Sequence, residues 1–592
     1  MAEEANKAKQ ETVKEASNFL RGTIAEELAR DTQKFGSDDA GLLKFHGTYQ
    51  QDDRDARKHR KPGDDKPYIF MVRTRVPGGK VSADQFLTEL SLGERLGNGT
   101  LRITTRQGFQ LHGVVKGNLQ ETIHEINKSL LTTLAACGDV DRNVMCCPAP
   151  HHNDGVHDRM QATADAIARH LTPQTRAYFE IWVDKEKVTE QSAGPDIEPI
   201  YGNAYLPRKF KTGIALPEDN CIDVYTQDVG LLGVVEGGQL VGYNVLVGGG
   251  LGATPSNLDT FPRLGDRMAF IAYDEVLPVV TAIVMVQRDF GNRADRKRAR
   301  MKYLVHDWGL PRFKAKVEEY LGGRTLADPH PVDIHGYDDH LGWHPQGNGK
   351  FYFGINVENG RIKDEGSLRL KTGLRCLFER FRMPGRLTPQ QSILLCDLEL
   401  EWKEEILALL REHGIKTHEE ISSVRRFAMA CPALPTCGLA ITEAERVMPS
   451  VVDELEVELA KLGLDTEKFT IRMTGCPNAC ARPYTSDIGL VGKAVGRYTI
   501  LVGGRLLGTR LNVIYKDMVP LREVVQELVP LLVYFKADRQ PGETFGDFCH
   551  RKGVEDLLRF DAEYKNRSQG SGIRNQESGV RNQESEPLTP DP

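Results

Sequence analysis

One arrangement of secondary structure occurs twice in this sequence, and this repetition limits the possible folds more than any other feature. The first copy begins with YIFMVRTRVPGGKVS, which predicts a hairpin or strand pair around a Gly-Gly turn. The helical pattern ADQFLTELSLGERLG and the alternating strand pattern TLRITTRQGFQLHGV follow it. The second copy, FYFGINVENGRIKDEGSLRLKTGLRCLFERF with GRLTPQQSILLCDL, predicts strand, Asn-Gly turn, strand, helix and strand. Such an internal repeat predicts a fold with two related halves.

The two copies align at two short segments. These are Pro77-Gly78-Gly79 with Glu358-Asn359-Gly360, and Arg102-Ile103-Thr104 with Arg386-Leu387-Thr388. Each copy precedes a longer stretch of mixed helix and strand character, at about 140–325 and 425–555. A chain of 592 residues is also too long for one hydrophobic core. The expected fold class is therefore α+β, in two pseudo-symmetric halves.

The charge and hydropathy of the chain exclude several function classes. A formal net charge of -6 gives no global basic field for nucleic acid, so any cationic site must be local. No stretch approaches the roughly 18 apolar residues that span a bilayer, and the N-terminus lacks the apolar core of a signal peptide. We therefore expect a cytoplasmic protein that binds neither membrane nor nucleic acid. The end of the chain repeats G-[IV]-R-N-Q-E-S and has too few apolar residues to order itself, which predicts a disordered tail.

Four of the eleven cysteines form a pattern typical of ligands. Cys431 and Cys437 are spaced C-x5-C, and Cys476 and Cys480 are spaced C-x3-C about forty residues later. Four thiolates from two loops can hold an iron–sulfur cluster, whereas zinc knuckles usually have shorter spacings; four unrelated buried thiols are the third interpretation. The other cysteines show no second quartet and are predicted to be packing residues: Cys137, Cys146, Cys147, Cys221, Cys376, Cys396 and Cys549.

The segments ACPALPTC and TGCPNACARP together resemble the cluster-binding signature of the sirohaem-containing sulfite and nitrite reductases. The likeness extends from SNFLRGTIAEEL to TFGDFCHRKG, and thus over nearly everything except the tail. It departs from the family at Ala479, where glycine is frequent. The resemblance implies that the four cysteines bind a [4Fe–4S] cluster and that Cys480 also ligates the iron of a sirohaem.

The resemblance also implies how the two halves are built. Each half is expected to consist of a ferredoxin-like half-domain followed by a larger α/β domain that binds the sirohaem or the cluster. The expected segments are an N-terminal wrapping arm at 1–60, half-domains at 61–138 and 329–424, a sirohaem and substrate domain at 139–328, a cluster domain at 425–563 and a disordered tail at 564–592.

Four cations match the positions that bind substrate in this family: Arg73, Arg142, Lys209 and Lys211. The last two form a Lys-x-Lys pair, which on a strand would place both ammonium groups on one face. An isolated pair of this kind is more often exposed on an edge strand, but the flanking PRKFKTG matches the family.

A second group of cations is expected to bind the carboxylates of the macrocycle. Its members are Arg102, Arg106, Arg293, Arg296 and Lys297. The run RADRKRAR has the alternative interpretations of a solvated helix face or a nucleic-acid patch. Arg482, two residues after Cys480, either neutralises negative charge on cluster or haem or is a structural arginine.

The glycine-rich segment VGGGLGA lacks the rest of a dinucleotide fingerprint, and no flavin or nicotinamide motif occurs elsewhere. By resemblance this loop approaches the haem, and electrons come from a separate protein. The resemblance favours ferredoxin as donor, with an NADPH-dependent flavoprotein as the alternative. The two lysines and RNV favour sulfite, reduced by six electrons to sulfide, over a nitrite reductase that forms ammonia. A zinc-stabilised scaffold and a basic-patch RNA binder are hypotheses from other classes.

Overall fold

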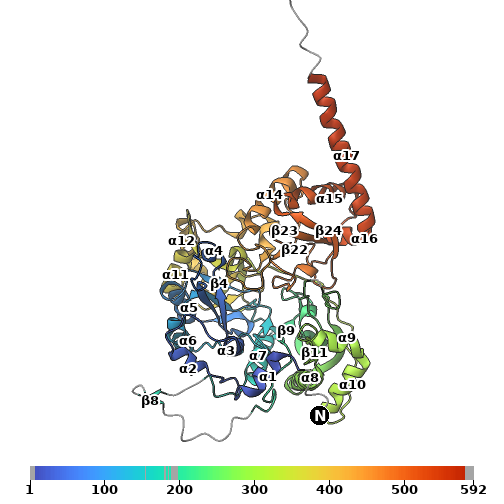
Figure 1. Cartoon of the computed structure of the whole chain (residues 1–592). Helices are drawn as coiled ribbons and strands as arrows, with labels where there is room; N and C mark the ends of the chain where they lie inside the picture. Colours follow the sequence, from blue (N-terminus) through green and yellow to red (C-terminus); the bar gives the residue numbers. More distant parts are fainter. Residues whose placement is uncertain are drawn as a thin grey trace, which may run out of the picture.

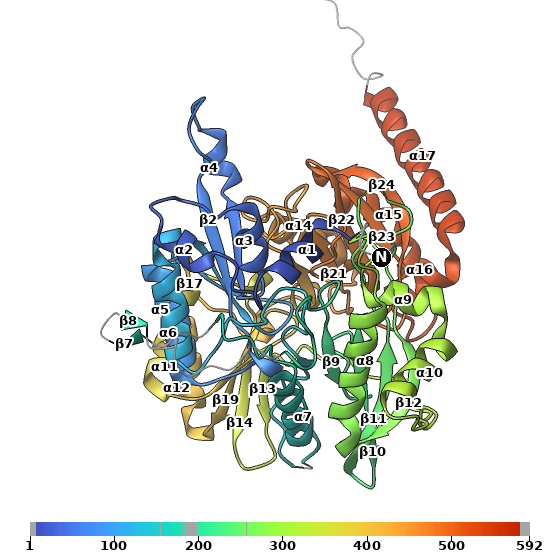
Figure 2. The same cartoon turned by 60° about the horizontal axis from the view of Figure 1, so that its bottom comes forward.

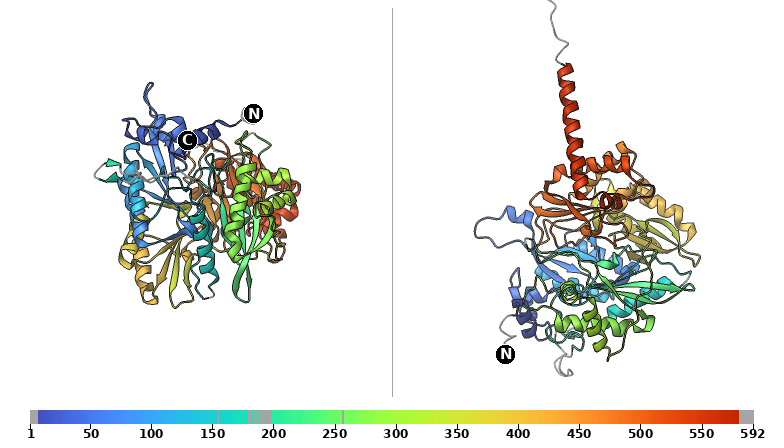
Figure 3. Two further views of the ribbon diagram at one scale, coloured as in Figure 1. Left: turned by 90° about the horizontal axis from the view of Figure 1, so that it is seen from below. Right: turned by 90° about the vertical axis from the view of Figure 1, so that its right-hand side faces the viewer.

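The computed structural model describes residues 7–153, 155–178, 182–183, 186–187, 198–255 and 257–579. Two sheets with their helices, drawn in blue to cyan and in yellow, lie on one side of the molecule (Figure 1). The green and the orange to red parts form the other side, and Figure 3 shows the same division from below. The predicted α+β fold in two related halves is confirmed by this arrangement.

The N-terminal arm consists of short helices that pack against the body of the protein. Helices α1 (Lys9–Ala16), α2 (Ile24–Ala29) and α3 (Ser37–Leu42) precede strand β1 (Thr48–Asp52), and α4 (Arg54–Lys58) follows it. Lys14 is buried, forms an ion pair of 2.6 Å with Glu11, and donates to the carbonyl of Leu206 at 2.7 Å. Strand β1 pairs with the first half-domain, so the arm also adds a strand to that sheet.

The first half-domain has a five-stranded sheet whose last strand comes from the second copy. Its order is β1, β2 (Tyr68–Arg73), β5 (Phe109–Val114), β4 (Leu101–Ile103) and β15 (Arg361–Ile362). Helices α5 (Ala83–Arg95) and α6 (Leu119–Lys128) cover it. Helix α5 starts where predicted because Ser82 and Gln85 form a capping box, and it buries Phe86 and Leu90.

The second half-domain mirrors the first. Its sheet has the order β13 (Gly342–Pro345), β14 (Phe351–Ile355), β19 (Ile393–Leu398), β18 (Gly385–Leu387) and β3 (Lys80–Val81), with helices α11 (Leu370–Phe381) and α12 (Lys403–Glu412). A short ribbon of β16 (Asp364–Glu365) and β17 (Leu368–Arg369) precedes α11. The hairpin or strand pair predicted around the Gly-Gly turn is wrong, since β3 pairs with β18 of the opposite sheet and not with β2. Strand β15, after the Asn-Gly turn, likewise crosses and pairs with β4. One hydrophobic core therefore contains residues of both half-domains.

The two turns that the sequence aligned have the same backbone shape. Both are single 3-10 turns, η2 (Pro77–Gly79) and η6 (Glu358–Gly360), with a left-handed central residue. The φ angle is 58° at Gly78 and 51° at Asn359. Each turn therefore directs the strand that follows it out of its own sheet and into the opposite one.

The two α/β domains are also built alike. The first has sheet order β6 (Met145–Cys146), β9 (Thr212–Ala215), β10 (Val229–Glu236), β11 (Gln239–Val247) and β12 (Asp266–Ala272). The second has β20 (Ala428–Ala430), β21 (Ile471–Thr474), β22 (Ile488–Ala494), β23 (Arg497–Val502) and β24 (Val513–Pro520). In both sheets the first three strands are parallel to one another. The fourth strand pairs antiparallel with the third, and the fifth pairs antiparallel with the fourth.

Helices cover both of these sheets (Figure 2). They are α7 (Val156–His170), α8 (Val276–Phe290), α9 (Met301–Trp308) and α10 (Leu310–Tyr320) in the first domain, and α13 (Ser423–Arg426), α14 (Met448–Leu462), α15 (Val524–Asp538), α16 (Phe545–Lys552) and α17 (Val554–Gly579) in the second. A further ribbon joins β7 (Trp182–Val183) and β8 (Glu186–Lys187). Helix α17 extends into the segment predicted to be disordered from residue 564, and residues 580–592 lie outside the described part.

Candidate active site

A pocket opens where loops of the two α/β domains meet, and its lining is cationic. Five lining residues are lysines or arginines and none has a carboxylate, so the pocket suits an anion. The exposed thiol of Cys480 belongs to the same lining. The lining residues are Thr105, Arg106, Met145, Lys209, Lys211, Thr226, Gln227, Leu251, Gly252, Arg300, Asn478, Ala479, Cys480 and Arg482.

Lys209 and Lys211 both face this pocket, directly before β9. Between them Phe210 forms a bridge with Asp141 and is buried, so the backbone is extended there and the two lysines share a side. Burial, and then the neighbouring arginines 208 and 300, lower the pKa of Lys209 to about 7. Burial also lowers the pKa of Lys211 well below its usual range, with Arg106 contributing. An anion in the pocket would favour the charged form of both lysines.

Arg73 and Arg142 lie beside this pocket and not in its lining. Arg73, the last residue of β2, donates to the Sγ atom of Cys137 at 3.0 Å. Arg142 and Arg73 both act on the pKa of Tyr49, which is raised mainly by burial and by Cys137. Arg142 also contributes to the lowered pKa of Lys209. The two arginines and the two lysines therefore belong to one continuous positive region.

Of the cations expected to clamp a macrocycle, Arg106 lines the pocket and Arg102 does not. Arg106 donates to the Oε1 atom of Gln227 at 2.8 Å, and burial lowers its pKa to about 9. Arg102 is 1% exposed, forms an ion pair with Glu445 and donates to the carbonyl of Ala430 at 2.9 Å. Arg102 thus supports the loop that begins the cysteine quartet.

The other three predicted clamp residues lie farther out. Arg293 pairs with Glu11 of the arm, and Arg296 makes two hydrogen bonds of 2.8 and 3.0 Å to Asp139. Lys297 is exposed. The structure does not bring these three into the pocket lining. Arg293 joins the arm to the first α/β domain, and Arg296 binds Asp139 within that domain.

Two cations of the same basic run were missed by the sequence reasoning. Arg300 lines the pocket and pairs with Asp228 at 2.7 Å. Lys302 is fully buried, and its Nζ atom donates to the carbonyls of Gly250 at 3.0 Å and Gly252 at 2.7 Å. It thereby holds the glycine-rich loop against the pocket, and burial lowers its pKa to about 6. The run itself signals positive charge, but not which of its members face inward.

Arg482 both lines the pocket and forms a buried ion pair. Its guanidinium lines the pocket, yet its Nε atom lies 2.5 Å from the carboxylate of Asp223, which is fully buried. Arg472 approaches the same carboxylate at 2.7 Å. Asp223 and Arg482 are equivalent in the two halves, because each caps a 3-10 turn, η4 (Val224–Thr226) or η9 (Pro483–Thr485), with φ near 53° or 54°.

The cysteine quartet comes from two loops of the second α/β domain. Cys431 follows β20, with Cys437 shortly after it, and Cys476 and Cys480 lie between β21 and η9. Burial raises the pKa of the first three thiols, to about 11 for Cys476, and in each case the negative charge of Cys480 is the next cause. Four thiols that oppose each other's ionisation in this way are suited to a positively charged iron cluster.

The spacing of the quartet does not suit a single ion. Within the described part of the chain, one group of at least three His, Cys, Asp or Glu side chains places its ligand atoms within 4.8 Å of one another, and it contains none of the quartet. A zinc ion needs its ligands this close, whereas a cluster of four irons accepts one sulfur at each corner. The residues present therefore fit a [4Fe–4S] cluster.

The group with close ligand atoms lies outside the quartet. Cys147 and Cys221, predicted to be packing residues, are buried and lie together with Asp219 and His340. The two cysteines are 74 residues apart in the sequence, so no short spacing indicated that they belong to one group.

Within the described residues, no helix combines the length and the apolar character that crossing a bilayer requires.

Family models match most of the chain. The model described as "Nitrite and sulphite reductase 4Fe-4S domain" matches residues 162–325 and 422–567. The model described as "Nitrite/Sulfite reductase ferredoxin-like half domain" matches residues 61–129 and 344–413. Each model thus matches twice, once in each half.

Curated proteins and a solved structure resemble the chain over its length. The sulfite reductase [NADPH] hemoprotein beta-component of Staphylococcus saprophyticus is 45% identical, covering 93% of this chain and 96% of that protein. The sulfite reductase [ferredoxin] of Synechococcus elongatus is 43% identical, covering 95% and 92%. The structure of the Mycobacterium tuberculosis NirA protein matches with a TM-score of 0.75 at 27% identity, covering 94% of this chain and 98% of that one.

Proposed function

Because the chain belongs to the family of nitrite and sulfite reductases, we propose that it reduces sulfite to sulfide with six electrons. The reaction uses a sirohaem coupled to a [4Fe–4S] cluster. The observation that carries the proposal is the pocket itself, in which five cations and the exposed Cys480 thiol meet without any carboxylate in the lining. Sirohaem carries carboxylates and sulfite is an anion, so both need such a surface.

Cys431, Cys437, Cys476 and Cys480 would hold the cluster, and Cys480, which faces the pocket, would also ligate the haem iron. When bound, the two groups supply an iron that binds the substrate and a store of electrons next to it. Arg102 supports the first cysteine loop through its hydrogen bond to the carbonyl of Ala430. The macrocycle carboxylates would be met by Arg106 and Arg300, with Arg293, Arg296 and Lys297 at the outer edge.

Lys209 and Lys211 would bind the oxygens of the substrate and donate protons to them. A lysine whose pKa is lowered to about 7 gives up a proton readily near neutral pH, which suits a general acid. Arg73 and Arg142 would add fixed positive charge on the Cys137 side of the pocket. Each oxygen that leaves as water needs two protons, so several donors in one place are an advantage.

Sulfite fits this set of donors better than nitrite does. A dianion with three oxygens makes use of two lysines and two arginines, whereas a monoanion with two oxygens needs fewer. The curated relatives cited above are sulfite reductases that differ in their donor, NADPH for one and ferredoxin for the other. Because the chain carries no flavin or nicotinamide motif of its own, its electrons must come from a separate protein. We propose ferredoxin as this donor, with an NADPH-dependent flavoprotein as the alternative.

The test begins with the ultraviolet–visible spectrum, iron and acid-labile sulfide of the purified protein. Sirohaem bands with five irons per chain, four in the cluster and one in the haem, are expected. Sulfide production is then measured with reduced ferredoxin and, separately, with NADPH and a flavoprotein, with nitrite as the competing substrate. A colourless protein, or ammonia formation that exceeds sulfide formation at equal substrate concentration, would contradict the proposal.

A further inference from the structure

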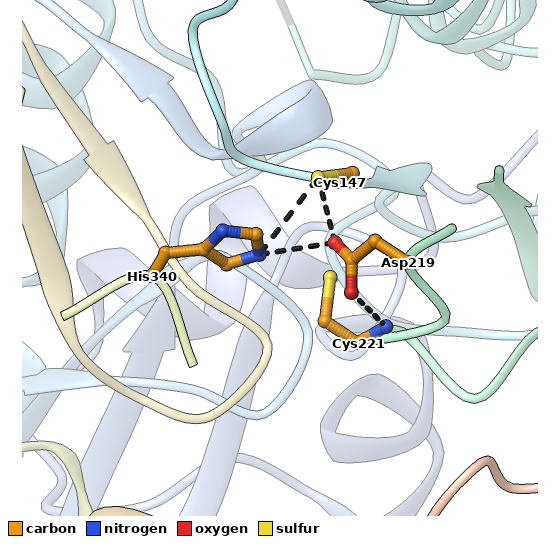
Figure 4. Close-up of side chains that lie close together, drawn as sticks. All are labelled: Cys147, Asp219, Cys221 and His340. Atoms are coloured by element: carbon orange, nitrogen blue, oxygen red, sulfur yellow. Dashed lines mark hydrogen bonds and ion pairs between the residues drawn. The ribbon is translucent and has the colours of Figure 1, made fainter. Parts of the chain in front are cut away.

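A second group of ligand side chains comes mainly from the first half of the chain, whereas the cysteine quartet lies in the second half. The Sγ atoms of Cys147 and Cys221, a carboxylate oxygen of Asp219 and a ring nitrogen of His340 all lie within 4.8 Å of one another (Figure 4). We propose that these four side chains bind one zinc ion. The site is separate from the cluster and haem, and it is argued from its own geometry.

The distances suit a tetrahedral ion. Zinc–ligand bonds of about 2.0–2.3 Å place the ligand atoms about 3.3–3.8 Å apart. The Sγ atom of Cys147 lies 3.8 Å from the Nε2 atom of His340. The Oδ2 atom of Asp219 lies 3.0 Å from that nitrogen and 2.8 Å from the sulfur, so Asp219 and Cys147 would move apart by roughly half an ångström when the ion binds. The Sγ atom of Cys221 lies within 4.8 Å of the other three ligand atoms.

The surroundings hold the ligand atoms in place. The second carboxylate oxygen of Asp219 accepts from the backbone N–H groups of Cys221 at 3.0 Å and of Asp338 at 3.1 Å, which leaves Oδ2 directed toward the thiol and the imidazole. His340 has the left-handed φ of 59°, and its backbone N–H donates to the carboxylate of Asp338 at 3.0 Å. Such outer contacts orient the ligands in metal sites.

Burial argues against a catalytic Cys-His-Asp group. Exposed fractions are 1% for Cys147, 0% for Cys221, 6% for Asp219 and 3% for His340. No substrate reaches a thiol in that position, but a small ion bound during folding does. Two thiolates and an imidazole also favour zinc over calcium or magnesium, which prefer oxygen ligands. Binding would release the two thiol protons.

The duplication explains why ligands occur here. Cys147 stands in Met-Cys-Cys-Pro-Ala where Cys431 stands in Met-Ala-Cys-Pro-Ala. Cys221 precedes a Tyr-Thr pair by four residues, as Cys480 does in the other half. The equivalent strands β6 and β20 lead into the two loops. The first half thus keeps two thiols of the pattern, while aspartate and histidine provide ligands for a single ion.

The ion would join parts of the chain that form the active pocket. Cys147 lies two residues after Met145, which lines the pocket, and Cys221 lies two residues before Asp223, the partner of Arg482. His340 precedes the first strand of the second half-domain. The site therefore connects the first α/β domain to the opposite half-domain.

Metal content of the holoenzyme tests the proposal. Protein from zinc-supplemented medium is passed over a chelating resin, and zinc and iron are measured on the same sample by mass spectrometry. One zinc per chain is expected in addition to the iron. His340→Asn, which tolerates the left-handed backbone, and Cys221→Ser should each lower zinc at least tenfold while iron is retained. Cys146→Ser changes a buried neighbour outside the group and should leave the zinc content unchanged. His340→Cys supplies another ligand at the same position and should also retain zinc.

X-ray absorption at the zinc edge of the unmutated protein tests the same point without relying on variants that fold. Two sulfur and two nitrogen or oxygen neighbours are expected, whereas four sulfurs would place the zinc in the quartet and overturn the proposal. A zinc-free protein that also takes up neither Zn²⁺ nor Co²⁺ after its thiols are reduced overturns it as well. So does unchanged zinc in both ligand variants, or a Cys147–Cys221 disulfide in protein purified without oxygen.

Discussion

At the scale of single residues, charges that are equivalent in the two halves neutralise each other in the interior. The carboxylate of Asp223 is fully buried and forms ion pairs with both Arg482 and Arg472. A sequence pattern can place Arg482 two residues after Cys480, but the carboxylate that balances it lies more than 250 residues away. The interior therefore contains two cations whose cost of burial depends on one anion.

Asp223→Asn should destabilise the protein strongly. Removing one partner of a buried ion pair leaves uncompensated charge and costs about 3–5 kcal/mol in free energy of unfolding. Urea unfolding followed by circular dichroism measures the change. Asp517→Asn, which removes an exposed ion pair with Lys493, is the control and should cost less than about 1 kcal/mol. Equal effects of the two substitutions would contradict the role given to Asp223.

Lys209→Met should reduce the rate of sulfite reduction without removing the cofactors. Loss of a general acid typically costs about 10²–10⁴-fold in kcat. The haem spectrum and iron content should stay unchanged, because methionine keeps most of the side-chain volume. Lys461→Met on the exposed face of α14 is the matched control. Full activity of the Lys209 variant would show that protons reach the substrate from elsewhere.

The affinity for sulfite should depend on the protonation of Lys209. Its pKa is lowered to about 7 by burial and by neighbouring arginines, and a bound anion raises it again. Binding therefore takes up a proton above pH 7, and affinity falls as pH rises through that range. Comparing log KM against pH for the unmutated protein and Lys209→Met cancels the titration of sulfite itself. If log KM changed with pH in the same way in both proteins, sulfite binding would not depend on the protonation of Lys209.

At the scale of secondary structure, short strands are exchanged between the half-domains. Strand β3 pairs with β18, and β15 pairs with β4, after two turns of the same shape. The last glycine of each turn has φ of 77° and lies against a carbonyl of the opposite half-domain. A Cβ atom at Gly360 would lie 2.1 Å from the carbonyl oxygen of Ile103. The exchange therefore depends on glycine there.

Gly360→Ala should weaken the contact between the two half-domains. The positive φ costs about 1–2 kcal/mol for an L-residue, and the overlap with a backbone carbonyl adds about 1–3 kcal/mol. Gly99→Ala separates these causes, since Gly99 has φ of 82° but no atom within 4 Å of the added carbon. Thermal unfolding should show the larger loss at residue 360. A loss no greater than that at residue 99 would mean that the turn relaxes away from Ile103.

At the scale of the whole molecule, neither half is complete without the other. The half-domains share one hydrophobic core, and the pocket takes lysines from one half and Cys480 from the other. Residues 1–328 expressed alone should be insoluble or lack cooperative unfolding, because β15 and β18 are missing from the pairings of β4 and β3. Co-expression with residues 329–592 should restore a folded, coloured complex. A folded fragment 1–328 with native-like amide-exchange protection would contradict this prediction.

Much of the fold was predictable because it rests on local patterns. The helix from Ala83, the two turn segments and the repeated strand patterns each follow from neighbouring residues, and the structure confirms them. The hairpin around the Gly-Gly turn was predicted wrongly, because a turn pattern does not say which strand a segment will pair with. Arg300 and Lys302 were missed for a similar reason, since the direction of a cation in a basic run depends on Asp228 and on carbonyls far along the chain.

The sequence by itself determined the duplicated α+β plan, the cysteine quartet and the positive residues on which the proposed chemistry depends, since these follow from residue type and short spacing. Only the tertiary structure decided which cations line the pocket, that Asp223 balances Arg482, that strands cross between half-domains and that Cys147, Asp219, Cys221 and His340 meet. The physical reason is that burial and long-range pairing set the direction and charge balance of a side chain, and these are properties of its neighbours in space.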